Sequence, residues 1–213
     1  MSAAAAAHLL TRHTHRRRGA PPLTFLGELG LERGRVHEVC GSARRTLAVQ
    51  VAGRLTGPVM WIAPSWTAGR LNPEGMLPFV SPSRFLFVSP RRPEDVLWSM
   101  EEALRSGAVP FVVADLPGPP GLTSVRRLHL AAEAGAEAGE APLGVLLTPG
   151  EGGAPGVESR WAMAGDHGTD GGMAWRLDRR RARTAPENRW GVGLGKDGLT
   201  LAGRSVPGEQ PGQ

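Results

Sequence analysis

The sequence has one cysteine, one lysine and no long apolar run. A single cysteine, Cys40, cannot form an internal disulfide, which excludes a disulfide scaffold, and it excludes a cysteine-rich zinc module as well. No apolar run approaches the roughly 20 residues that a membrane-spanning helix needs. We therefore expect a soluble, cytoplasmic protein with no membrane partner.

The composition indicates one folded domain with many loops. Apolar residues make up 40% of the 213 residues and charged residues 21%, while glycine and proline contribute 30 and 19 residues. Positive charge is concentrated in two segments, residues 1–20 and 176–189, which carry +4 each of a total of +5. The rest of the chain therefore sums to −3, so the central part is not basic.

Proline and the strand pattern divide the chain into three parts. We expect a flexible basic arm over residues 1–24, because Pro21 and Pro22 disfavour a helix before them. Residues 25–200 should form the domain, and residues 201–213 a disordered tail.

Within the domain, apolar segments alternate with amphipathic ones. The apolar segments predict strands over 35–40, 59–63, 85–88, 109–116 and 143–148. Helices are predicted over 46–55, 93–105 and 123–134, with Thr123 capping the third. Shorter alternating segments follow at 160–163, 174–183 and 190–194. This order predicts an α/β fold with three layers, a mainly parallel central sheet and antiparallel strands at its C-terminal edge.

The first strand-to-helix turn, where phosphate often binds in such folds, resembles a degenerate phosphate-binding loop. Gly41 could be its first glycine, and Arg45-Thr46 stand where lysine and threonine would be. Only three residues separate Gly41 from Arg45, whereas a working loop has five and a second glycine. Asp115 ends a predicted buried strand, as a magnesium-linked acid would. We interpret Gly41, Arg45, Thr46 and Asp115 as a relic nucleotide site without a cofactor.

Other possible enzyme activities would depend on isolated residues. Cys40 could be a nucleophile beside His37, but a lone cysteine at the end of a strand is more often a small buried residue. His129 fits a hydrogen-bonded core histidine better than a ligand. We expect no catalytic activity.

Two surfaces are candidates for binding macromolecules. The basic segment could contact nucleic-acid phosphate through Arg176, Arg179, Arg180, Arg181 and Arg183. Strand alternation would place Arg176 and Arg180 on one side, and Arg179, Arg181 and Arg183 on the other. A solvated edge strand protected by its charge is the alternative. For protein partners, the candidates are the loop around Trp66 and the Arg92–Arg105 helix, with Arg92, Glu101 and Arg105.

Residues 29–148 resemble the core of RecA-type recombinases. The most specific part is Ala103–Val109, followed by the strand ending in Asp115 and by Leu122-Thr123. The ImuA family, RecA-like proteins with a degenerate nucleotide loop, is closer still. The segments that carry this similarity are Gly34–Glu38, Arg92–Arg105, Arg126–Gly135, Ser159–Trp161 and Trp175–Leu177.

This resemblance implies a RecA-like fold and a role as an accessory protein in mutagenic translesion synthesis of the SOS response. It further implies a translesion polymerase-related protein and the RecA recombinase as partners. The sequence departs from an active recombinase in its short loop and in Ala63-Pro64-Ser65, where the acid that positions water would be. The alternatives are a weak ATP-binding RecA-type NTPase, an SOS cell-division inhibitor and a DNA-binding protein.

Overall fold

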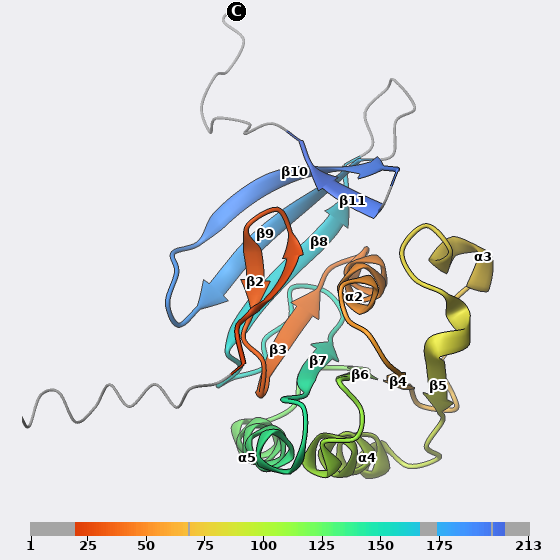
Figure 1. Cartoon of the computed structure of the whole chain (residues 1–213), viewed down its shortest axis with the longest axis vertical. Helices are drawn as coiled ribbons and strands as arrows, with labels where there is room; N and C mark the ends of the chain where they lie inside the picture. Colours follow the sequence, from red (N-terminus) through yellow and green to blue (C-terminus); the bar gives the residue numbers. More distant parts are fainter. Residues whose placement is uncertain (1–19, 68, 167–173, 197, 203–213) are drawn as a thin grey trace, which may run out of the picture.

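The computed structural model describes residues 20–67, 69–166, 174–196 and 198–202. Its main feature is a nine-stranded sheet with the order β11-β10-β9-β8-β3-β7-β6-β4-β5 (Figure 1). The strands from β8 to β5 in this order run parallel, and β9, β10 and β11 are antiparallel additions. Their bounds are β3 Arg35–Cys40, β4 Val59–Ile62, β5 Phe85–Val88, β6 Phe111–Asp115, β7 Leu143–Leu147, β8 Ser159–Gly165, β9 Ala174–Ala182, β10 Asn188–Gly195 and β11 Gly198–Leu201. The predicted α/β class is confirmed.

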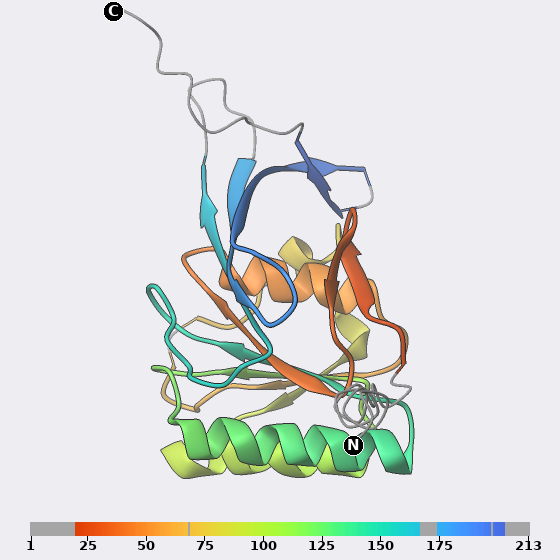
Figure 2. The same ribbon diagram turned by 90° about the vertical axis from the view of Figure 1, so that its left-hand side faces the viewer.

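Helices cover the two faces of the parallel part. Helices α4 (Pro93–Ser106) and α5 (Leu122–Ala138) lie side by side on one face, and α2 (Arg44–Gly53) lies on the other (Figure 2). Each face buries its own apolar cluster, one between the sheet and α4 and α5, the other beneath α2. The loop between β4 and β5 contains the short helix α3 (Pro73–Met76) and a 3-10 turn, Pro82–Arg84.

A hairpin that the sequence pattern did not predict packs beside α2. It consists of β1 (Leu23–Leu26) and β2 (Leu29–Leu31), whose leucines join the cluster beneath α2. Phe25 packs edge-on against Trp161 of β8, with ring centroids 5.2 Å apart. β1 begins two residues before the expected domain start at residue 25, and the rest of the expected arm up to residue 19 lies outside the described residues. So does the expected tail after residue 202.

The ends of the helices follow local sequence signals to different degrees. Helix α4 begins with Pro93 and two acids, Glu94 and Asp95, and ends at Gly107, whose φ of 64° favours glycine. The prediction for this helix is confirmed. Thr123 was predicted to cap α5, and this is wrong: the N-cap is Gly121, and no side chain bonds to the helix end.

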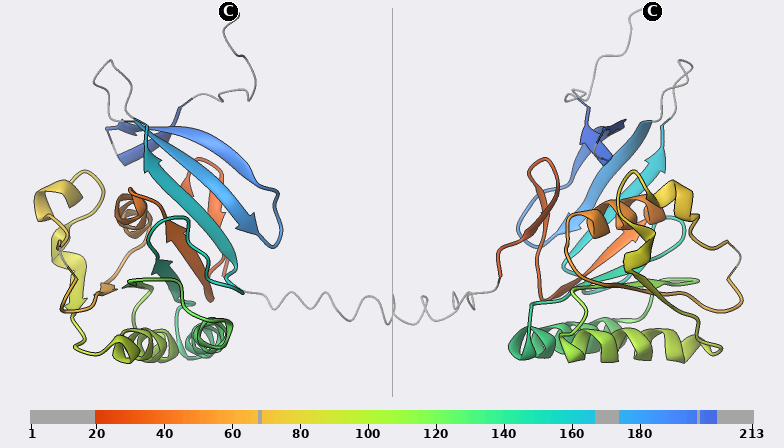
Figure 3. Two further views of the ribbon diagram at one scale, coloured as in Figure 1. Left: turned by 180° about the vertical axis from the view of Figure 1, so that it is seen from behind. Right: turned by 45° about the vertical axis from the view of Figure 1, so that its right-hand side comes forward.

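The antiparallel strands β9, β10 and β11 lie at one edge of the sheet, as predicted, but the basic segment is not its outermost strand. β9 lies between β8 and β10, so the basic segment is not an edge strand. The real edge beside β4 is β5, which was predicted only as an apolar strand (Figure 3). Two of its four side chains, Leu86 and Phe87, are 50% and 58% exposed.

Candidate functional site

The fold brings the expected nucleotide-site residues together at the carboxyl ends of two strands. Gly41 directly follows β3, and Asp115 is the last residue of β6. β7 lies between these strands and pairs in parallel with both. Arg45 and Thr46 lie in the first turn of α2, so the four residues surround one corner of the sheet.

Two backbone donors of the loop are occupied by carbonyl groups from elsewhere in the chain. Gly41 donates its N–H to Gly150 O at 3.0 Å, and Ala43 donates to Met163 O of β8 at 2.9 Å. Gly41 has a φ of 89°, and a Cβ at this position would lie 2.3 Å from Met163 O. A phosphate-binding loop needs such N–H groups to point at the ligand. Here a carbonyl oxygen of β8 stands against the loop where an anion would have to enter.

Asp115 is neutralised by arginines of the same corner. It is buried, and its Oδ2 accepts a hydrogen bond from Arg45 Nε at 2.7 Å. Arg44 Nε lies 3.8 Å from the other carboxylate oxygen, and Arg45 also donates to Gly69 O at 3.0 Å. A buried carboxylate requires such partners because desolvation of an unpaired charge is costly. The geometry makes Asp115 an ion-pair partner that holds α2 against β6.

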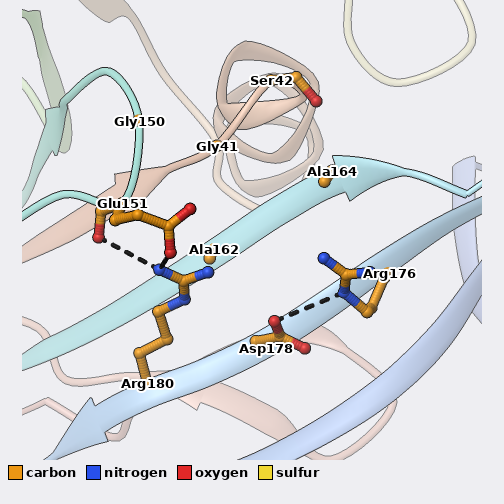
Figure 4. Close-up of a pocket in the computed structure, with 9 residues that line it drawn as sticks. All are labelled: Gly41, Ser42, Gly150, Glu151, Ala162, Ala164, Arg176, Asp178 and Arg180. Atoms are coloured by element: carbon orange, nitrogen blue, oxygen red, sulfur yellow. Dashed lines mark hydrogen bonds and ion pairs between the residues drawn. The ribbon is translucent and has the colours of Figure 1, made fainter.

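A pocket of about 250 Å³ opens beside this loop, between β8, β9 and the segment after β7 (Figure 4). Arg176 and Arg180 line it, and both were candidates for contacting nucleic acid. Each faces an acid: Arg180 pairs with Glu151, and Arg176 Nε lies 3.5 Å from Asp178 Oδ2. The hydrogen bond to Glu151 raises the pKa of the Arg180 guanidinium. The positive charge of this pocket is therefore largely balanced within the chain.

The remaining arginines of the basic segment do not form one surface. Arg179 lies over the rings of Trp161 and Trp190, at 5.6 and 5.2 Å from their centroids. A register shift occurs where Arg160 pairs with Arg181 and Trp161 pairs with Arg179. Because directly paired residues share a face, Arg179 and Arg181 point to opposite faces, and the predicted simple alternation is wrong.

The end of this segment is paired as well. Arg183 Nε lies 3.6 Å from Glu158, whereas Arg181 is exposed and has no acidic partner within the described part of the chain.

The predicted protein-docking residues have different surroundings. Trp66 is 50% exposed, and its loop is held beside the end of β5 by a hydrogen bond from Ser65 N to Pro90 O. Arg92 is exposed at the start of α4.

Glu101, by contrast, is buried. Its two oxygens bind Arg105 at 2.5 Å and Arg127 of α5 at 2.8 Å. Glu101 therefore ties α4 to α5 through Arg127, whereas its pair with Arg105 lies within α4.

Sequence reasoning missed the most strongly coordinated carboxylate, Glu38 of β3. Glu38 is completely buried and accepts hydrogen bonds from four residues of the β7–β8 region. These donors are Thr148 Oγ1 at 2.7 Å, Gly153 N at 2.8 Å, Ala154 N at 3.1 Å and Arg160 Nε at 2.5 Å. The available signal was an acid in the middle of an apolar strand, and its role is to order the loop after β7.

Cys40 and His37 do not form a catalytic pair. Burial raises the pKa of the Cys40 thiol to about 11, so it is protonated at neutral pH. His37 is buried, and desolvation lowers its pKa to about 4. Its Nε2–H donates to Glu32 O at 3.0 Å, and Nδ1 accepts from Ser159 Oγ at 2.7 Å. His37 is thus a neutral structural residue. His129 is half-buried rather than in the core, and Nε2 bonds to Gly156 O.

Among the described residues, no group of three or more metal-ligating side chains could hold a metal ion, and no helix could span a membrane.

Comparisons with known proteins do not identify the chain. No family model matches the sequence, and no curated protein matches it either.

Proposed function

We propose that this chain is a non-catalytic accessory protein with a RecA-like core, which docks other proteins during SOS-type DNA damage tolerance. The observation that carries the proposal is the occupied loop: Met163 O stands against Gly41 and accepts the N–H of Ala43. Because the N–H groups of Gly41 and Ala43 are bound internally, these two donors cannot point at a phosphate.

The pairing of Asp115 and the lack of an acid directly after β4 also favour a non-catalytic role. Asp115 is bound by Arg45 at 2.7 Å, which competes with any magnesium ion for the same carboxylate. The residues after β4 are Ala63, Pro64 and Ser65, none of which can act as a general base for hydrolysis.

A docking role is supported by the edge of the sheet. We call Trp66, Leu86 and Phe87 the β5 edge surface; each is at least 50% exposed. β5 contains no charge and no proline, which are the features that usually protect an edge strand. An extended segment of a partner could pair with this edge and cover the apolar side chains.

Binding to purified partners tests this proposal. The full chain should bind RecA or a translesion polymerase subunit, and replacing Leu86 and Phe87 by serine should weaken that binding at least about tenfold. Leu77→Ser is the matched control, because Leu77 is 65% exposed directly after α3 and does not belong to β5. In cells, deletion should lower the damage-induced mutation frequency. Absence of binding to either partner, or an unchanged mutation frequency, would refute the proposal.

A further inference from the structure

A groove of about 430 Å³ runs along α5, separate from the loop that carries the relic site. Its walls come from α5, from Arg35 at the start of β3, from Gly156 before β8 and from Arg183 after β9. The relic loop leads into α2, on the opposite face of the sheet (Figure 1). Gly156 has a φ of 82°, and a Cβ there would lie 2.8 Å from Leu122 Cδ1, so the loop closes tightly against the start of α5.

The exposed row of α5 in this groove has a distinctive order. Leu122, Arg126 and Leu130 are spaced four residues apart, which places them along one side of the helix. Leu122 is 41% exposed and Leu130 63%, and Arg126 is exposed between them. The groove thus presents an apolar, a basic and again an apolar side chain in succession.

The charges of the groove are incompletely balanced. Arg35 binds Glu133 and lies 3.8 Å from Glu158, and Arg183 shares Glu158 at 3.6 Å. Arg126 has no acidic partner among the described residues. Three guanidinium groups therefore face two carboxylates, and the free positive charge lies between the two exposed leucines.

We propose that this groove binds a peptide segment of a protein partner in which an acidic side chain is flanked by apolar ones. The carboxylate would pair with Arg126, and the apolar side chains would cover Leu122 and Leu130. The inference rests on the proposed docking function and adds a second, chemically defined surface to it. A nucleic-acid strand fits less well, because its phosphates gain nothing from the leucines and its successive charges would meet only one arginine without an acidic partner among the described residues.

Peptide selection on the immobilised full chain tests the proposal. A random peptide library should yield sequences with Asp or Glu between apolar residues. A fluorescently labelled peptide from this set should lose at least about tenfold in affinity on Arg126→Glu, as expected for a lost charge-assisted hydrogen bond. Arg54→Glu is the control, since it makes the same charge change at an exposed position following α2. Both variants should keep the far-ultraviolet dichroism of the parent chain.

Charge exchange adds a stricter criterion. A peptide with lysine in place of its acid should bind Arg126→Glu better than it binds the parent chain. The proposal would be overturned if no peptide were enriched, or if the enriched peptides lacked acidic residues. It would also be overturned if the labelled peptide bound the parent chain and Arg126→Glu with equal affinity. So would single-stranded DNA that binds in an Arg126-dependent way while no peptide does.

The two proposals can fail separately. ATP hydrolysis by the same preparation would refute the non-catalytic function and leave the peptide result intact. If the chain binds RecA or the polymerase subunit but the peptide experiment fails, only the proposal that the groove binds a peptide is refuted.

Discussion

Glu38 holds together parts of the chain that are more than 100 residues apart. Its carboxylate binds Thr148, the backbone of Gly153 and Ala154, and Arg160, while its own surface is fully buried. Breaking a buried ion pair by removing one partner leaves an uncompensated charge and unsatisfied donors. At this position an amide could accept some of these bonds, but its NH₂ group would face donors.

Replacing Glu38 by glutamine should therefore destabilise the protein strongly. We expect a loss of about 3 kcal/mol in the free energy of unfolding, measured by urea denaturation. Glu102→Gln on the exposed side of α4 is the control and should change it by less than about 0.5 kcal/mol. Similar stability of the two variants would contradict the role assigned to Glu38.

His37 makes stability depend on pH. Burial lowers its pKa from 6.5 to about 4, so the folded state binds fewer protons than the unfolded state between these values. Its neighbours Arg35 and His129 also disfavour the charged form. Stability contributed by neutral His37 is fully present above pH 6.5 and is lost as the pH falls toward 4, about 3 kcal/mol in total.

The measurement is urea unfolding at a series of pH values. The parent chain should lose stability steadily between pH 6.5 and 4, and His37→Gln should show a smaller slope, equivalent to about one proton. His129, whose pKa is also lowered by burial, contributes in the same direction, so His129→Gln should reduce the slope as well. A slope unchanged in His37→Gln would show that His37 is not the titrating group.

At the scale of secondary-structure elements, one register shift between β8 and β9 divides the arginines that the sequence suggested for binding nucleic acid between the two faces of the sheet. The register shift opposite Arg160 and Trp161 sends Arg181 to the opposite side of the sheet from Arg179, which pairs with Trp161 and lies on the tryptophan side. On that side the Arg179 guanidinium lies over both indole rings, 5.6 and 5.2 Å from their centroids, and donates to Pro186 O at 2.8 Å. A side chain held in this way stabilises the packing of β8, β9 and β10.

Alanine substitutions should separate the arginines of β9. Arg179→Ala should cost about 1–2 kcal/mol in the free energy of unfolding, from the lost cation–π contacts and hydrogen bond. Arg181→Ala should leave stability within about 0.5 kcal/mol, because Arg181 is exposed. Equal effects in thermal or urea unfolding would contradict the assignment of Arg179 to the packing.

The sequence predicted the elements that depend on local signals, and it missed those that depend on residues far away in the chain. β6 and β7 were predicted because continuous apolar runs need burial on both faces, and α4 because its proline, acids and glycine are local signals. The β1–β2 hairpin and β11 were not predicted, since short strands are stabilised by distant residues such as Trp161 and Gln50. The proximity of Gly41 and Asp115 could be predicted from strand ends, but the contact of Met163 O could not.

At the scale of the whole molecule, β8 closes the corner that a nucleotide would use. β8 pairs in parallel with β3 over Glu38–Cys40, which carries its backbone directly past the loop that follows β3. The hydrogen bond from Ala43 N to Met163 O and the ion pair of Arg45 with Asp115 then fill the corner from two sides. An apolar strand edge and an apolar-basic groove remain exposed elsewhere.

Titration of the purified full chain with ATP and magnesium by calorimetry tests this account most directly. Because Met163 O and Arg45 occupy the contacts that phosphate and magnesium would need, we predict no saturable heat at millimolar nucleotide. Saturable binding that is lost in Arg45→Ala and Asp115→Asn would contradict it, since the corner would then be a working nucleotide site.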